Sequence, residues 1–160
     1  MRQILAALAL LALASPAGAQ TLSGLARVVD GDGVSIGGVS IRLWGIDAPE
    51  LRQECVRGGE VYACGRESAD HLTRLVEGRP VVCTQLDRDR HGRPVSRCWA
   101  RDVDLSAAQV EAGHALAFRR YSEEYVPHED RARAARAGMW AGPFVAPWEY
   151  RAARPTAPRP

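Results

Sequence analysis

Alternating apolar and polar positions along the chain predict a small β-rich fold. Five segments carry this strand pattern or short apolar runs, namely residues 22–29, 34–36, 39–44, 81–86 and 94–100. Gly37 and Gly38 separate the second segment from the third, which is a strong signal for a β-hairpin. A charged turn at residues 87–93 separates the last two segments. The chain therefore offers five strands, grouped as three and two.

Helical periodicity adds three helices to this pattern. Residues 67–77 place apolar side chains at helical spacing, and Gly78 followed by Pro80 ends the helix. Asp104 is suited to cap a second helix that runs to residue 112. Residues 127–137 predict a third helix, and residues 51–65 a loop. Five strands interrupted by a helix favour an α+β, mainly β fold, a five-stranded Greek-key barrel of the OB-fold type.

The two ends of the chain differ from its middle. Residues 1–19 combine a basic start, an apolar run and a small-x-small sequence that ends at Ala19, which predicts a secretory signal peptide cleaved after Ala19. A membrane anchor or a buried helix is the alternative for this segment. Residues 20–148 are expected to form one domain, and the Pro- and Arg-rich residues 149–160 a disordered tail. A secreted or periplasmic protein without a membrane segment is predicted.

Four cysteines remain after removal of residues 1–19, and an even number in a small exported domain favours disulfides. Four cysteines allow three pairings. The two local pairs are favoured here, because Cys55 and Cys64 bracket one loop while Cys83 and Cys98 lie in strands on either side of a turn. A zinc site is the alternative, but the chain contains no C-x-x-C spacing.

The charge of the chain gives little information about partners. The formal net charge is +2, and removal of Arg2 with the signal leaves 20 basic against 19 acidic residues, or +1. Every basic residue is arginine, which binds phosphate in a bidentate manner, although a compositional bias explains this equally well. A nucleic-acid partner must therefore be argued from local clustering of charge.

Three carboxylates lie where strands end, and two arginines lie near them. Asp32 follows the first strand, and Asp47 and Glu50 follow the third. If these ends meet, the mutual repulsion of the carboxylates calls for a cation, and hard oxygen ligands suit Ca²⁺ or Mg²⁺. Arg42 points away from the apolar face of its strand and Arg93 ends the charged turn, so both could bind a phosphodiester. Taken singly, each is better explained as an ordinary turn or surface residue.

Three segments together resemble the signature of the staphylococcal nuclease family. They are residues 28–32 (VVDGD), 41–50 (IRLWGIDAPE) and 89–93 (DRHGR). The similarity continues through residues 65–69, 110–115 and 138–140, and so covers about residues 22–141. The family fold is an OB-type barrel of five strands with three helices, in agreement with the predicted elements.

The resemblance implies a calcium-dependent nuclease. Asp32 and Asp47 match calcium-binding aspartates, and Ala48 matches a position whose backbone carbonyl faces the metal. Glu50 matches the proposed general base, and Arg42 and Arg93 match the phosphate-binding arginines. The implied reaction is hydrolysis of DNA and RNA, preferentially single-stranded or frayed, leaving 3′-phosphate ends. We expect a monomer.

Other positions leave room for alternatives. Tyr121 falls near an aromatic residue that borders the family's nucleotide pocket, although a core or surface role suits it equally. Gly33 replaces a common threonine, which would weaken the hold on Asp32, and His91 replaces a common tyrosine. His71, His114 and His128 show no ligand spacing. A catalytically weak nucleic-acid-binding module and an exported structural protein are the competing hypotheses.

Overall fold

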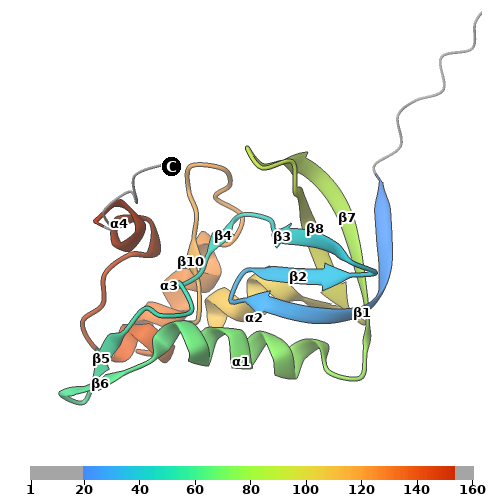
Figure 1. The fold of residues 1–160 in the computed structure, drawn as a ribbon. Coiled ribbons are helices and arrows are strands. Elements are labelled where there is room, and N and C mark those ends of the chain that lie inside the picture. The colour runs from blue at the N-terminus through green and yellow to red at the C-terminus, as the bar shows by residue number, and fades with distance from the viewer. Residues whose placement is uncertain (1–19, 154–160) are drawn as a thin grey trace, which may run out of the picture.

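The computed structural model describes residues 20–153, so the expected signal peptide at residues 1–19 lies outside the described residues. The centre of the molecule is a closed barrel (Figure 1). Its strands are β1 (Thr21–Asp30), β2 (Gly33–Ile36), β3 (Val39–Leu43), β7 (Pro80–Arg88) and β8 (Pro94–Ala100). They follow the order β3-β2-β1-β7-β8, and a parallel pairing of β3 with β8, in which Arg42 lies opposite Val95, closes the barrel. The predicted five-stranded OB-type barrel is confirmed.

Five short strands surround the barrel. These are β4 (Ile46–Asp47), β5 (Cys55–Arg57), β6 (Glu60–Tyr62), β9 (Val103–Asp104) and β10 (Leu116–Ala117). β9 extends the sheet at β8, β10 pairs with β4, and β5 pairs with β6. The prediction of a plain loop over residues 51–65 was wrong here, because Gly58 and Gly59, both with positive φ, turn the chain between two strands.

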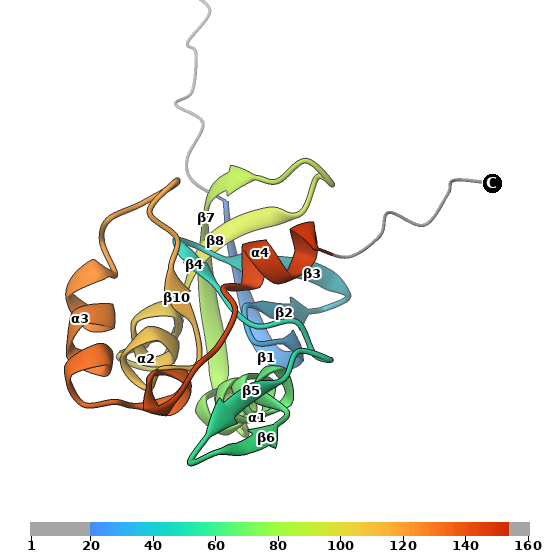
Figure 2. The same ribbon diagram turned by 90° about the vertical axis from the view of Figure 1, so that its left-hand side faces the viewer.

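The three predicted helices are present with shifted ends. They are α1 (Cys64–Val76), α2 (Leu105–Glu111) and α3 (Val126–Ala134). Asp104 caps α2 as predicted, because its side chain accepts hydrogen bonds from the backbone N–H groups of Ser106 and Ala107. α1 lies beneath the barrel, and α2 and α3 lie together beside it (Figure 2).

A short 3₁₀ helix, η1 (Gly138–Ala141), leads to a further helix that the sequence analysis did not predict. This helix, α4 (Pro147–Ala152), lies outside the barrel, on the side where β4 and β10 lie (Figure 1). The expected disorder of residues 149–160 is therefore wrong for residues 149–152, which Pro147 starts as a helix and which neighbouring residues hold in place. Residues 154–160 lie outside the described residues.

The core and the disulfides fix this frame. The barrel interior and α1 share one apolar cluster, to which Ile41, Leu43 and Leu72 each contribute side chains that are almost completely buried. Cys83 and Cys98 lie directly opposite each other on β7 and β8 and form one disulfide. Cys55 and Cys64 form the other, which ties β5 to the start of α1. Both predicted pairings are confirmed. Within residues 20–153, no helix has the length and apolarity needed to span a membrane.

Candidate active site

The acidic turn after β1 and the loop after β3 meet at one edge of the barrel. The Oδ2 atom of Asp32 accepts a hydrogen bond of 3.1 Å from the backbone N–H of Ala48. Asp47 on β4 is completely buried, and Asp32 is 8% exposed. The structure therefore brings together the strand ends that the sequence analysis expected to meet.

Two glycines allow these loops to pack on α1. A Cβ atom at Gly31 would lie 2.0 Å from Oγ of Ser68, and a Cβ atom at Gly65 would lie 1.8 Å from the carbonyl oxygen of Glu50. Neither contact leaves room for a side chain. Both acid-bearing loops are thus positioned against the same helix.

Arg42 joins the two buried aspartates. Its Nη2 atom lies 3.2 Å from Oδ2 of Asp32 and 2.9 Å from Oδ1 of Asp47. Burial disfavours the charge of Arg42, but the two carboxylates outweigh it and raise the pKa of the guanidinium. The alternation of β3 thus points Arg42 toward the carboxylates, away from the apolar face that Ile41 and Leu43 form.

The charged form of the Asp32 carboxyl is electrostatically disfavoured. Burial raises its pKa to about 7, and the nearby negative charges of Asp30 and Asp47 add to this, while Arg42 and the N–H of Ala48 oppose it. A buried carboxylate with a raised pKa is stabilised by additional positive charge. This site therefore favours the approach of a cation.

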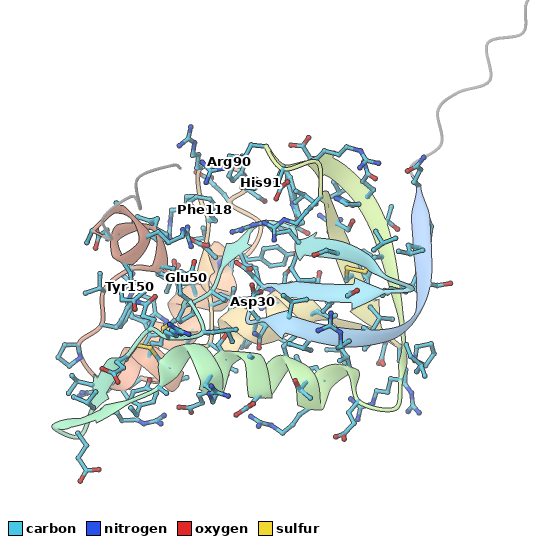
Figure 3. The ribbon with its side chains drawn as sticks, viewed as in Figure 1. Asp30, Glu50, Arg90, His91, Phe118 and Tyr150 are labelled. Atoms are coloured by element: carbon cyan, nitrogen blue, oxygen red, sulfur yellow. A yellow bond between two sulfur atoms is a disulfide. The ribbon has the colours of Figure 1, made fainter. Side chains whose placement is uncertain are left out.

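Asp32 and Arg42 border a cleft of about 570 Å³. The completely buried Asp47 does not line this cleft, but it is ion-paired with Arg42 and Arg151, which do. Glu50, Arg93 and Tyr121 line the same cleft, together with Ala48. Figure 3 shows Arg90 and His91 on the β7–β8 loop at one end of this region, with Glu50 and Phe118 between that loop and α1. The cleft thus unites the side chains singled out in the sequence, other than that of Asp47, with Ala48.

Asp89 holds Arg93 in place. The Asp89 carboxylate accepts a 2.7 Å bond from Nε of Arg93 and further bonds from the backbone N–H groups of His91 and Arg93. Although partial burial acts in the opposite direction, these hydrogen bonds lower the pKa of Asp89. Arg93 is thereby presented by a rigid turn, and Asp89 is a positioning residue that the sequence analysis did not single out.

Arg151 is the main feature of the cleft that the sequence analysis missed. It projects from α4, and its Nη1 and Nη2 atoms lie 3.1 Å and 2.7 Å from the two carboxylate oxygens of Asp47. Nη1 also lies 3.1 Å from Oε1 of Glu50. Burial alone would lower the pKa of Arg151, but the bonds and charges of Asp47 and Glu50 raise it above its ordinary value. The only signal in the sequence was Pro147, a favourable first residue for a helix.

Aromatic rings form the wall next to these charges. Phe118 stacks on Trp148 of α4, with ring centroids 5.7 Å apart and planes at 16°. Tyr121 meets Phe118 edge-on at 5.1 Å and is 57% exposed. Tyr121 therefore lies at the cleft, as predicted, but Phe118 rather than Tyr121 forms the inner part of the wall.

Gln53 connects the Glu50 loop to the segment before α4. Its side chain is completely buried, accepts a 3.3 Å bond from the backbone N–H of Glu50 and donates a 2.7 Å bond to the carbonyl of Val145. The side chain of Gln53 thus holds together the loop that carries Glu50 and the segment that leads into α4 and Arg151.

Comparison with known proteins assigns the family. Residues 40–142 match the family model described as staphylococcal nuclease homologue. The chain belongs to the staphylococcal nuclease family. It is 33% identical to Protein ParB of Escherichia coli, over 94% of this chain and 90% of that protein. It is 37% identical to the succinoglycan biosynthesis protein ExoI of Rhizobium meliloti (87% and 75%) and 28% identical to the micrococcal nuclease of Shigella flexneri (96% and 92%).

Membership of the staphylococcal nuclease family supports nuclease activity and a nucleic acid as substrate. The two disulfides fit a protein that folds in an oxidising compartment. Gly33, which stands where a threonine is common in the family, packs against Asp30. A Cβ atom at Gly33 would lie 2.6 Å from Oδ1 of Asp30, so the Asp30 side chain fills the space above this glycine.

The oxygen atoms in and next to the cleft are of the kind that bind a calcium ion. Carboxylate oxygens of Asp32 and Asp47 and the carbonyl oxygen of Ala48 are hard ligands, and no cysteine lines the cleft. Within residues 20–153, no three Asp, Glu, His or Cys side chains lie close enough to form a metal site by themselves. A backbone carbonyl and the substrate would therefore have to complete the shell, and Arg151 now occupies the oxygens of Asp47.

Proposed function

We propose that the protein is a calcium-dependent nuclease that hydrolyses DNA and RNA, preferring single-stranded or frayed substrates and leaving 3′-phosphate ends. The observation that carries this proposal is the shared cleft, in which Asp32, Glu50 and two arginines surround a space large enough for a nucleotide, with the buried Asp47 ion-paired to one of those arginines. The resemblance of the signature segments and the family assignment agree with it.

The residues of the chain divide the work. Arg42 and Arg93 would bind the non-bridging oxygens of the phosphodiester and stabilise the negative charge that grows as water attacks phosphorus. Glu50 would orient this water and accept its proton, which a carboxylate at the edge of the cleft can then pass to solvent. Asp32, Asp47 and the Ala48 carbonyl would hold Ca²⁺, which supplies Lewis-acid polarisation of the phosphate when bound.

The substrate and the compartment follow from the same features. The aromatic wall of Phe118 and Tyr121 offers a stacking surface to an unpaired base, which favours single strands. A monomer exported by residues 1–19 to the periplasm or the medium would form its disulfides there.

Cleavage of denatured DNA and of RNA tests the proposal. The oxidised mature protein is assayed with Ca²⁺ and with chelator, beside Glu50→Gln and Arg42→Ala. Each variant should lose at least about 100-fold in rate, because each removes an acid-base or charge-stabilising group. Glu54→Gln and Arg27→Ala serve as matched controls, since both parent side chains are exposed and neither lines the cleft.

The products and the alternative outcome are equally specific. Fragments labelled at the 5′ end should carry a 3′-phosphate that a phosphatase removes. Folded protein that binds single strands but cleaves none, with or without Ca²⁺, would replace the enzyme by a nucleic-acid-binding module.

A further inference from the structure

Helix α4 places the positively charged side chain of Arg151 against two acidic side chains of the candidate site, Asp47 and Glu50. The guanidinium of Arg151 makes three hydrogen bonds, two to the carboxylate of Asp47 and one to Glu50. Asp47 is completely buried, whereas the Arg151 side chain is 38% exposed. The arginine thus reaches from the surface to a carboxylate that water cannot reach.

This contact uses the oxygens that a metal would need. Both oxygens of Asp47 accept bonds from Arg151, and Oδ1 also accepts one from Arg42. A divalent cation that binds Asp47 would lie close to two guanidinium groups and be repelled by both. Arg42 comes from a barrel strand and is fixed, but Arg151 comes from a six-residue helix at the surface.

The same helix covers the aromatic wall. Trp148 stacks on Phe118, one turn before Arg151 on α4. The ring of Trp148 therefore lies on the face of Phe118 where an unpaired base would stack. One short helix blocks both the carboxylates and part of the stacking surface.

From these contacts we infer that α4 is an autoinhibitory lid, in which Arg151 competes with the divalent cation for Asp47 and Glu50. The inference rests on the proposed function, because it concerns the same cleft. Calcium binding and release of α4 are then one linked equilibrium, and the apparent affinity for calcium is reduced by the fraction of molecules whose lid is closed.

Calcium affinity measured by titration calorimetry tests this inference without any cleavage assay. Replacement of Arg151 by glutamine removes three charge-assisted bonds, so Arg151→Gln should bind Ca²⁺ about ten-fold more tightly or better than the wild type. Arg151→Lys keeps the charge but loses the bidentate geometry, so its affinity for Ca²⁺ should lie between those of the wild type and Arg151→Gln. Arg27→Gln makes the same change of net charge at an exposed position on β1, so its affinity for Ca²⁺ should match that of the wild type.

Tryptophan fluorescence gives a second readout. Addition of Ca²⁺ to the wild type should change the emission as Trp148 leaves Phe118, and the Trp148→Phe variant should lack this change while still binding Ca²⁺. A wild type that binds Ca²⁺ with the Trp148 emission unchanged would contradict the lid.

The outcomes separate this inference from the proposed function. Equal or weaker Ca²⁺ binding by Arg151→Gln, with calcium-dependent cleavage intact in the wild type, overturns the lid and leaves the nuclease. Absence of both Ca²⁺ binding and cleavage in the wild type and in Arg151→Gln overturns the calcium-dependent nuclease, and the lid with it.

Discussion

At the scale of single residues, Asp32 shows that the site is built at a cost in stability. Its carboxyl is buried beside two other aspartates, and its pKa of about 7 lies well above the ordinary 3.8. The folded protein holds a proton there that the unfolded chain releases, so the contribution of Asp32 to stability is complete below about pH 4 and is lost as the pH rises through about 7.

The Asp32→Asn variant tests this strain in the metal-free protein. We expect equal stability of variant and wild type near pH 4, and a variant more stable by on the order of 2–4 kcal/mol above pH 7, because asparagine carries no charge. Urea unfolding with chelator across this pH range measures the difference. Asp70→Asn, an exposed change on α1, should show no such trend, and an Asp32→Asn variant that is less stable at every pH would contradict the pKa shift.

Gly65 illustrates how one residue can set the position of the loop that carries Glu50. Alanine normally favours a helix over glycine by about 0.5–1 kcal/mol. In Gly65→Ala the new methyl group would meet the carbonyl oxygen of Glu50 at 1.8 Å, so we expect a loss of about 1–3 kcal/mol and weaker cleavage instead. Thermal unfolding and cleavage rates measure both effects. Thr73→Ala on the exposed side of the same helix should be neutral or stabilising, and the same result for Gly65→Ala would show that the loop yields without cost.

At the scale of elements, predictability from sequence depends on how local the determinants are. The hairpin at Gly37 and Gly38 and the cap at Asp104 were predicted because neighbouring residues decide them. Arg42 was placed correctly by the alternation of a single strand. The fold was therefore largely accessible from the sequence, with the ends of helices and the β5–β6 hairpin as the main departures.

Helix α4 was not accessible in this way. A helix of six residues has little stability of its own, and its composition resembles the Pro- and Arg-rich residues that follow it. Contacts with residues about a hundred positions earlier in the chain hold α4 in place. Arg151 binds Asp47, and the carbonyl of Val145, just before the helix, accepts a hydrogen bond from Gln53. Such contacts leave no periodic pattern, so Arg151 was missed while its partners Asp47 and Glu50 were found.

At the scale of the whole molecule, two disulfides brace different parts of the chain. The Cys83–Cys98 bond joins paired barrel strands, and the Cys55–Cys64 bond ties the segment after Glu50 to α1. Loops of 15 and 9 residues are closed by these bonds. Each should stabilise the fold by about 2–4 kcal/mol, mainly by restricting the unfolded chain.

Paired serine variants separate stability from function. We expect both Cys83→Ser/Cys98→Ser and Cys55→Ser/Cys64→Ser to unfold at lower urea concentration. Under conditions where both are folded, only the second should lose much cleavage activity, because its bond holds the Glu50 loop. Urea titration and cleavage rates measure this, and equal losses of activity would show that the second bond has no particular link to the site.

The parallel pairing of β3 with β8 has a consequence for how the site comes into being. Arg42 lies opposite Val95, two residues after Arg93, so the two arginines flank the seam at which the barrel closes. That seam joins positions about fifty residues apart, whereas β2 and β3 pair across a two-residue turn. Long-range pairings form late, after the entropy of closing a long loop is overcome. A chain that has formed its hairpins but not this seam already contains both arginines and cannot yet bring them together at the cleft. The proposed site is thus complete only after the barrel has closed, and the recovery of cleavage during refolding would time that closure.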